Sequence, residues 1–203
     1  GGGQAAHNVI TPKGVHHTFA QFGSGIFVRG VRTHLSHFML LDLDAIWNEA
    51  QHLQEIGCGN VFSRLSVDED ARIVTPFHKA SNRLRELYRG DGRHGSCGMG
   101  IGETMADSIT HPELTIYTRD LRDRNLLVQK LRVVQEIKYL ELKEICAAVS
   151  KDPKASGEIL VLQNTDVPLL VAESLWRIAM GFRIVPGSYL KRLGDEGGLI
   201  FEG

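Results

Sequence analysis

The chain has 203 residues, a length that predicts one domain with a sizeable buried core. Hydrophobic residues make up 42% and charged residues 23% of it, which excludes disordered and fibrous proteins. The 23 Lys and Arg residues nearly balance the 24 Asp and Glu residues, so the formal net charge is −1. This balance argues against a dominant nucleic-acid-binding surface and against a basic helix that lies on a membrane.

The sequence also shows no targeting signal and no closely spaced pair of cysteines. The sequence holds no apolar run of about 18 residues, so we expect no membrane span. The N-terminus lacks the charged and apolar regions of a signal peptide. The three cysteines are widely separated and form no Cys-x-x-Cys pair, which favours reduced thiols in a cytoplasmic protein.

The first 120 residues are predicted to be rich in short strands. Pro12-Lys13-Gly14 is typical of a hairpin turn between two β segments, Val9-Ile10 and Val15–Phe19. Asp42 or Asp44 can cap a helix that Gly57 and Gly59 end. Further strands are expected at 22–27, 38–41, 65–67 and 71–74, and a basic amphipathic helix at 78–89.

After residue 120 the pattern becomes helical. Leu121 to Val149 carries apolar residues at mixed three- and four-residue steps, which predicts a long amphipathic helix ended by Asp152-Pro153. A second helix is predicted from Pro168 to about Phe182, a short one over 189–193 and a strand over 198–201. The sequence thus indicates one α/β domain over 1–203, with a β-rich part at 1–120 and a mainly helical part at 121–203 that ends in a core strand.

A glycine-rich segment, His94–Thr104, is the most informative stretch. Four glycines within eight residues allow backbone N–H groups to turn toward an anion. The segment is neither a Walker A loop nor a dinucleotide fingerprint, because its glycines are spaced differently and no Gly-Lys-Ser/Thr follows. A phosphate-binding loop and a flexible surface loop both remain open. Cys97 lies in this segment without an accompanying His–Asp order, so a nucleophilic cysteine is not expected.

The N-terminal segment Gly1–Asn8 is a second candidate. Its small residues allow close approach of a ligand to the backbone, and His7 is suited to donate a proton near pH 7. The alternative is a frayed terminus with an incidental histidine. Two other patterns favour no site: His16 and His17 alternate across a strand, and a basic helix face is typical of a solvated surface. That face comprises Lys79, Arg83, Arg85 and Arg89.

Five short segments carry a family resemblance. They are Gly1–Asn8, Gly23-Ser24-Gly25, Pro76-Phe77-His78, His94–Glu103 and Phe201-Glu202-Gly203. In order and spacing they resemble the Gly-Gly-x-Asn-Ala-Gly-His-Thr, Pro-Ser-Gly, Pro-Tyr-His, Ile-Gly-Thr-Thr-Gly-Arg-Gly-Ile-Gly-Pro and Phe-Glu-Gly-Ala-Gln-Gly motifs of the adenylosuccinate synthetase family. The resemblance implies an α/β fold of that family, with an incomplete, P-loop-NTPase-related central sheet and flanking helices.

The resemblance also implies a function, that of a cytoplasmic GTP-dependent ligase of purine biosynthesis. GTP phosphorylates the 6-oxygen of IMP, and the amine of aspartate then displaces phosphate to give adenylosuccinate, with Mg²⁺ required. A related purine nucleotide or another amino donor is open as an alternative, because several motif residues differ. A homodimer is implied by the resemblance alone, and no nucleic-acid or membrane partner is expected.

Residue roles in the N-terminal motif follow from the same resemblance. His7 matches the histidine that hydrogen-bonds the transferring phosphoryl group. Gln4 lies where the family has an asparagine near the IMP phosphate, and Asn8 is a second nucleotide-binding position. Ala6 replaces the glycine whose backbone carbonyl faces the metal.

In the glycine-rich loop, Ser96 and Cys97 stand for the threonine pair that contacts the nucleotide phosphate and the amino-acid substrate, with Gly98 beside them. Cys97 offers a weak thiol donor in place of a hydroxyl. Met99 replaces an arginine, and residues 108–111 lack a Lys-x-x-Arg run that reaches the nucleotide of a neighbouring subunit. Each lost cation removes a contact of roughly 1.5–3 kcal/mol.

Two parts of the family pattern have no counterpart in the sequence. These are the N-terminal phosphate loop and the C-terminal substrate loops, and the chain begins with glycine. We therefore expect a partial domain, inactive alone, of an intact ligase. The alternative is a non-catalytic or truncated nucleotide-binding homologue.

Overall fold

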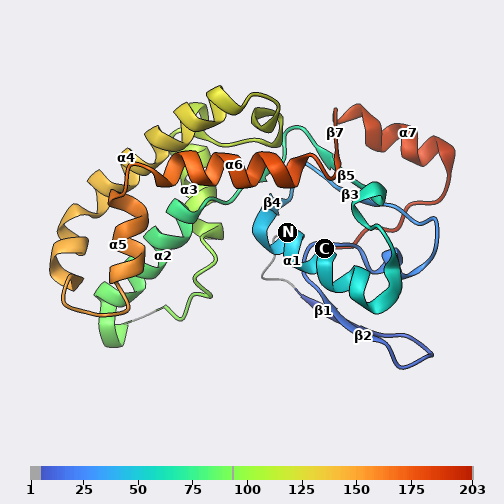
Figure 1. Cartoon of the computed structure of the whole chain (residues 1–203), viewed down its shortest axis with the longest axis horizontal. Helices are drawn as coiled ribbons and strands as arrows, with labels where there is room; N and C mark the ends of the chain where they lie inside the picture. The colour runs from blue at the N-terminus through green and yellow to red at the C-terminus, as the bar shows by residue number, and fades with distance from the viewer. Residues whose placement is uncertain (1–5, 93, 203) are drawn as a thin grey trace. The chain divides into compact units, whose positions relative to one another are not determined.

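The computed structural model describes residues 6–92 and 94–202 and divides the chain into two compact units. The first unit takes in the described residues of Gly1–Ile73, Tyr117–Leu121 and Leu175–Gly203. The second takes in those of Val74–Ile116 and Arg122–Ser174. Helix α6 (Val167–Ala179) contributes residues to both units (Figure 1).

The first unit begins with a β-hairpin. Strands β1 (His7–Ile10) and β2 (His16–Phe19) pair antiparallel, with His7 opposite Phe19 and Asn8 opposite Thr18. Gly14 takes a positive φ of 80° in the connecting turn, which glycine adopts without steric cost. The predicted hairpin is confirmed. His17 is buried and His16 exposed, as the alternation along a strand predicts.

Parallel strands form the rest of the sheet structure in the first unit. Strand β5 (Leu65–Asp68) lies between β3 (Thr33–Leu35) and β7 (Arg183–Val185) and is buried along its whole length. Strands β4 (Leu40–Leu41) and β6 (Arg72–Ile73) form a second parallel pair. The predicted α/β class is confirmed. The strand expected at 38–41 is shorter, because the Met39 N–H donates to the Ser36 carbonyl at 3.0 Å and closes a turn that ends before Leu40.

Helices in the first unit follow the strands. Helix α1 (Leu43–Leu53) begins after Asp42, whose side chain accepts a hydrogen bond from the Ala45 N–H, and α7 (Ser188–Glu196) follows β7. The strand expected at 22–27 is wrong, because Ser24–Phe27 forms a 3₁₀ turn closed by hydrogen bonds to the Gly23 and Gly25 carbonyls. Further short helical turns of the first unit are Gln54–Cys58 (a π turn) and Phe62–Arg64, whereas Gly90–Gly92 and Pro112–Leu114 lie in the second unit, and Thr118–Arg122 ends where the second unit resumes.

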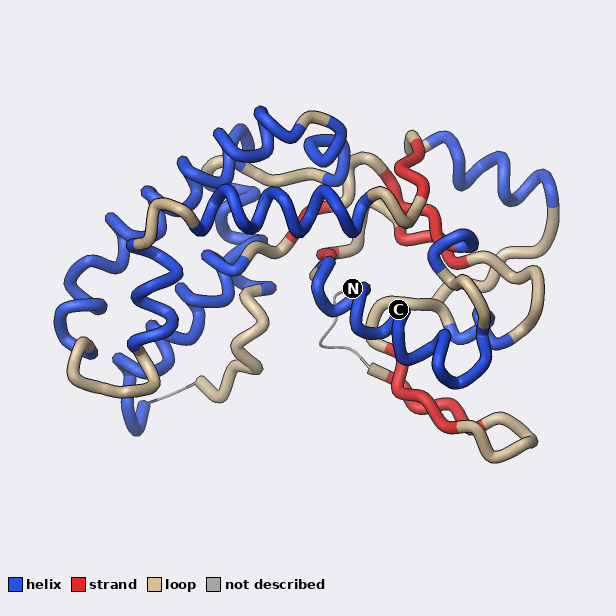
Figure 2. The backbone as a smooth tube through the Cα atoms, viewed as in Figure 1, coloured by secondary structure: helices blue, strands red, loops and turns tan. Residues whose placement is uncertain are grey.

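The second unit is helical (Figure 2). Helix α2 (Pro76–Arg89) contacts three other helices, α3 (Ile101–Thr110), α4 (Arg124–Val149) and α5 (Ser156–Gln163). The core of the second unit contains fully buried apolar side chains of α2 and α4, namely Phe77, Ala80, Leu84, Leu127, Leu131 and Leu142. The predicted long helix is confirmed in α4, whereas α3 and α5 were not predicted.

The expected core strand at 198–201 is wrong. Residues 198–201 have no regular secondary structure, and Ile200 and Phe201 are 89% and 80% exposed. In a parallel sheet a core strand buries both faces, and none of the described strands pairs with this segment. Within the described residues, no helix is both long and apolar enough to cross a membrane.

Candidate functional site

His7 lies at the end of the hairpin in the first unit, between an aromatic ring and a carboxylate. Its imidazole stacks on Phe19, with the ring centroids 5.6 Å apart and the planes 23° apart. Its Nε2 lies 3.6 Å from Oε2 of Glu202, and the His7 side chain is about half exposed. The hairpin register explains the stacking, because His7 is directly opposite Phe19.

Ser24 holds the Glu202 carboxylate beside His7. The Ser24 backbone N–H donates to both carboxylate oxygens, at 3.0 and 3.2 Å, and the Ser24 hydroxyl donates to Oε1. Gly23 lies beside this pair, and a Cβ there would be in ordinary van der Waals contact with Glu202, at 3.6 Å, and with the Thr33 hydroxyl, at 3.5 Å. The His7 ring and the Glu202 carboxylate are therefore neighbours at 3.6 Å, a separation beyond that of a direct hydrogen bond.

The other predicted residues of the N-terminal motif have fewer contacts that point to a binding site. Asn8 is on the hairpin, where its Oδ1 accepts a hydrogen bond of 2.5 Å from the hydroxyl of Thr18, the residue opposite it. Ala6 is exposed and precedes β1. Gln4 lies outside the described residues. The structure therefore places His7 and Asn8 on one strand but does not bring Asn8 to the Glu202 carboxylate.

A magnesium ion does not fit the described residues on their own. Among residues 6–92 and 94–202, no group of three His, Cys, Asp or Glu side chains is arranged to hold a metal ion. The resemblance assigns the metal only one protein ligand, the Ala6 carbonyl, whereas Mg²⁺ requires six oxygens in near-octahedral geometry. Substrate phosphates and water would have to supply most of that shell.

In the second unit the glycine-rich loop is bound to α2. One oxygen of Glu86 accepts the backbone N–H groups of Gly95 and Ser96, at 3.1 and 3.3 Å. The Ser96 hydroxyl donates to Asn82 at 3.0 Å. Burial alone raises the pKa of Glu86, but hydrogen bonds from Arg89 and from the loop backbone outweigh burial and lower that pKa. An ionised carboxylate therefore occupies the loop amides for which the sequence left phosphate binding open.

Glycines shape the remainder of the loop. Gly98 has φ +70°, and its carbonyl accepts a hydrogen bond of 3.1 Å from Arg83 Nε. Gly100 has φ +73° at the start of α3, where a Cβ would lie only 2.8 Å from backbone atoms of His78 and Lys79. Cys97, between these contacts, is an exposed free thiol. The predicted loop residues Ser96, Cys97 and Gly98 thus lie together beside α2.

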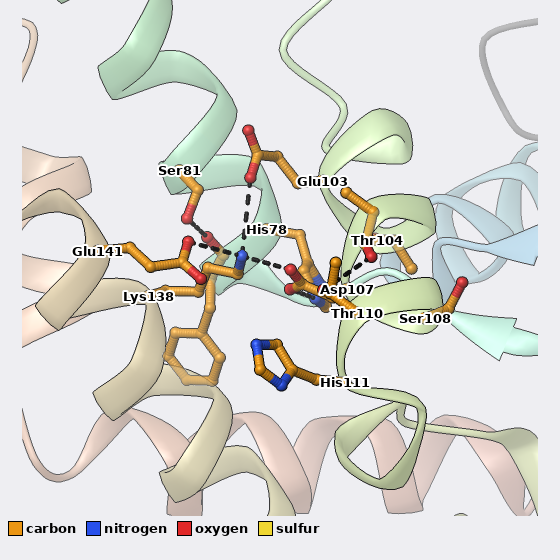
Figure 3. A network of polar contacts seen from close by, with 12 residues as sticks. His78, Ser81, Glu103, Thr104, Asp107, Ser108, Thr110, His111, Lys138 and Glu141 are labelled. Atoms are coloured by element: carbon orange, nitrogen blue, oxygen red, sulfur yellow. Dashed lines mark hydrogen bonds and ion pairs between the residues drawn. The ribbon is translucent and has the colours of Figure 1, made fainter.

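A buried lysine of α4 forms ion pairs with carboxylates of α3, the helix that follows this loop. Lys138 is 2% exposed, and its Nζ lies 2.5 Å from Asp107, 3.0 Å from Glu141 and 3.8 Å from Glu103 (Figure 3). Burial alone lowers the pKa of Lys138, but the hydrogen bonds to Asp107 and Glu141 and their negative charges raise it above its usual value. The lysine therefore stays charged in the folded protein.

His78 connects α2 to the same network. Its Nδ1 accepts a hydrogen bond of 3.1 Å from the Thr75 N–H, which closes the N-terminus of α2, and its Nε2 lies 3.2 Å from Asp107. Burial alone raises the pKa of Asp107, but the hydrogen bonds from His78 and Lys138 lower it overall. The network fixes α2, α3 and α4 relative to one another within the second unit.

A small cavity adjoins this network. It has a volume of about 20 Å³, room for about one water molecule and far less than a nucleotide needs. Its lining includes Asp107, His111 and Thr115, and the buried Thr115 hydroxyl has no hydrogen-bond partner among the residues that the structure describes. This cavity is therefore too small to hold a nucleotide.

Sequence reasoning missed the partners of the predicted residues. Glu202 and Ser24 were noticed only as motif letters, and Glu86 not at all. The basic face of α2 was expected to be solvated, but three of its arginines form ion pairs with carboxylates: Arg83 with Glu158, Arg85 with Glu103 and Glu141, and Arg89 with Glu86. The one local signal was Glu86, three residues before Arg89 on the same helix, a spacing at which opposite charges on a helix are neighbours.

Known proteins resemble this chain over most of its length. The family model "Adenylosuccinate synthetase" matches residues 1–167. An adenylosuccinate synthetase of Mycobacterium avium is 27% identical over 200 residues, which are 98% of this chain and 45% of the relative. One of Mycolicibacterium vanbaalenii is 29% identical over 184 residues, 87% of this chain and 42% of the relative. The chain thus spans less than half the length of these curated relatives.

A solved structure shares the fold. It is described as the fully ligated adenylosuccinate synthetase of Plasmodium falciparum, and it matches 96% of this chain and 41% of its own with a TM-score of 0.66 and 15% identity. At this identity the match concerns the fold alone, whereas the family model covers well over half of the chain. The chain belongs to the adenylosuccinate synthetase family.

Proposed function

We propose that the protein carrying this chain is a GTP-dependent C–N ligase of purine nucleotide biosynthesis. It joins aspartate, or another amino donor, to the 6-position of IMP or of a related purine nucleotide. The observation that carries the proposal is the placement of His7, stacked on Phe19 and 3.6 Å from a carboxylate that Ser24 holds in place. An incidental histidine at a frayed end would have no such partners.

The proposed reaction has two steps. The γ-phosphoryl group of GTP moves to the 6-oxygen of the purine, releasing GDP. The amine of the amino acid then attacks C6, and the 6-oxygen leaves as part of inorganic phosphate. His7 donates a hydrogen bond to the phosphoryl group in transfer, where charge spreads over the oxygens, and a donor fixed beforehand is most effective there.

The remaining assignments are also proposals from family membership. Gln4, Asn8, Ser96, Cys97 and Gly98 would contact nucleotide or substrate. Mg²⁺ would reach the site with the phosphates of GTP and supply charge neutralisation, and the Ala6 carbonyl would be one ligand. The protein would act in the cytoplasm as a homodimer.

A second candidate function is non-catalytic nucleotide binding. It is favoured by one observation, the occupation of the Gly95 and Ser96 amides by Glu86, which leaves these two donors engaged. The replacement of a hydroxyl by the Cys97 thiol is consistent with it. Under this candidate, nucleotide binds but no phosphate is released.

The test is GTP-dependent phosphate release by the protein at its encoded length, measured against a panel of purine nucleotides and amino acids. His7→Ala is expected to lower turnover by about 100-fold or more and to leave GTP binding within a few-fold. His16→Ala, at an exposed position of the same hairpin, is the matched control and is expected to keep turnover. Absence of release with every pair would favour the second candidate, and full turnover in His7→Ala would remove His7 from the mechanism.

A further inference from the structure

Helix α1 carries a carboxylate on its buried face. Glu49 is 8% exposed and lies on the face that also buries Ile46, Ala50 and Leu53. Burying an ionised carboxylate is costly unless hydrogen bonds replace the lost water. The partners that Glu49 has gained are therefore informative about what the residue does.

Those partners are consecutive backbone N–H groups that follow β2. Gln21 N–H donates to Oε2 at 2.8 Å, Ala20 N–H donates to Oε1 at 3.0 Å, and Phe22 N–H lies 3.4 Å from both oxygens. The ring of His17 adds a contact of 3.4 Å to Oε1. Charge-assisted hydrogen bonds of this kind are about twice as strong as neutral ones, so both oxygens of Glu49 hold residues 20–22 on α1.

The same segment is bound to the start of α1 by a second route. The side chain of Gln21 donates to the Asp42 carbonyl at 3.0 Å and accepts the Asp42 N–H at 3.2 Å. Both groups of the amide are thus used, and Gln21 is 4% exposed. Residues 20–22 are fixed on α1 at two places, which leaves this turn little freedom to move.

The residues on both sides of this turn contribute to the surroundings of His7. Immediately before the turn is Phe19, whose ring stacks on the His7 imidazole. Shortly after it is Ser24, which binds the Glu202 carboxylate that lies 3.6 Å from His7 Nε2. The two contacts of His7 therefore depend on the two flanks of the segment that Glu49 holds.

We propose that Glu49 is a positioning residue for His7. It acts through the backbone of residues 20–22, which sets the Phe19 ring on one side of the imidazole and the Ser24–Glu202 pair on the other. The catalytic consequence rests on the proposed function, in which His7 donates to the transferring phosphoryl group. The structural consequence, a change in the surroundings of the His7 ring when Glu49 is altered, does not depend on that function.

Glu49→Gln is the informative substitution. The amide keeps one acceptor oxygen and turns an NH₂ group toward a backbone N–H, so one side of the segment loses its partner. Glu55→Gln is the matched control, because Glu55 follows α1 with its side chain 76% exposed. If Glu49→Gln does not fold, Gln21→Ala serves instead, because it loosens the same segment without leaving a buried charge unpaired.

Two readouts are measured on the protein at its encoded length. The first readout is the ¹⁵N-edited NMR spectrum of the imidazoles, in which the His7 signal is identified by its loss in His7→Ala. We expect this signal to shift in Glu49→Gln and in Gln21→Ala, and to stay unchanged in Glu55→Gln. In kinetics, Glu49→Gln is expected to lower kcat by tenfold or more with KM for GTP within about twofold, since misplacement by about 1 Å costs up to about 100-fold.

The two readouts separate the possible failures. An unchanged His7 signal in a folded Glu49→Gln or Gln21→Ala variant would overturn the positioning role, whatever the kinetics. A shifted signal, with turnover unaffected by His7→Ala, would support the positioning role and refute the part of the proposed function that assigns His7. A kcat for Glu49→Gln equal to that of Glu55→Gln, in an enzyme that does need His7, would also overturn the proposal.

Discussion

Gly100 sets the entry into α3, and replacing it tests how the glycine-rich loop is held. Its φ of +73° costs an L-residue about 1–2 kcal/mol. A Cβ at this position would also lie 2.8 Å from the His78 carbonyl carbon and the Lys79 nitrogen, which are backbone atoms of α2. Overpacking against backbone of this kind costs about 1–3 kcal/mol. Gly100→Ala is therefore expected to lower the free energy of unfolding by about 2–5 kcal/mol.

The assay is urea unfolding followed by circular dichroism, with Gly102→Ala as the matched control. Gly102 lies in the first turn of α3, and a Cβ there meets no atom within 4 Å. Alanine in place of glycine in a helix is expected to raise the free energy of unfolding by about 0.5–1 kcal/mol. The two substitutions thus have opposite signs two residues apart. A Gly100→Ala protein as stable as the parent would refute the close packing of the loop on α2.

Two further predictions concern buried titratable groups. Lys138→Met is expected to lower the free energy of unfolding by about 3–5 kcal/mol, because it leaves the carboxylate of Asp107 and its neighbours without their cation. The control Lys143→Met, at an exposed position of the same helix, is expected to change it by less than about 0.5 kcal/mol. Equal effects of the two substitutions in chemical denaturation would contradict the network. Burial lowers the pKa of His17 more than Glu49 raises it, so the unfolded chain binds a proton at this residue more readily than the folded chain does. The contribution of His17 to the free energy of unfolding is therefore fully present above about pH 6.5, the pKa of a free histidine, and is lost as the pH falls below that value. His17→Phe should flatten the fall in Tm between pH 7 and 5, and an unchanged slope would contradict this account.

Local patterns predicted the elements that local interactions stabilise. The hairpin follows from its Pro-Lys-Gly turn, and α4 follows from apolar residues at three- and four-residue steps over 26 residues. Two helices were missed for opposite reasons. Helix α3 begins among glycines, which weaken helix propensity, and α5 contains a continuous apolar run, Ile159–Leu162, without the period of a helix.

Long-range contacts explain the errors in strand prediction. The apolar residues Leu199–Phe201 have the composition of a strand but no ladder partner among the described strands, and their side chains remain exposed. Strand β7 has three residues and forms because β5 offers it an edge, which no local pattern reveals. Strand formation depends on a partner elsewhere in the chain, so composition alone does not decide it.

The candidate site was predictable only in part. His7 and the loop residue Ser96 follow from motifs, but the groups that hold them come from elsewhere: Ser24 and Glu202, for example, are 178 residues apart in the sequence. Glu49 gave a signal that went unused, since a carboxylate between Ile46 and Leu53 on a buried helix face must have found hydrogen-bond donors.

The central claim is transfer of a phosphoryl group to the 6-oxygen of a purine nucleotide, and the fate of that oxygen tests it directly. The protein at its encoded length is incubated with GTP, aspartate and IMP carrying ¹⁸O at the 6-position, and the released phosphate is analysed by mass spectrometry. The account predicts one ¹⁸O atom in each phosphate released. Unlabelled phosphate would contradict it, because the 6-oxygen would then not have received the phosphoryl group.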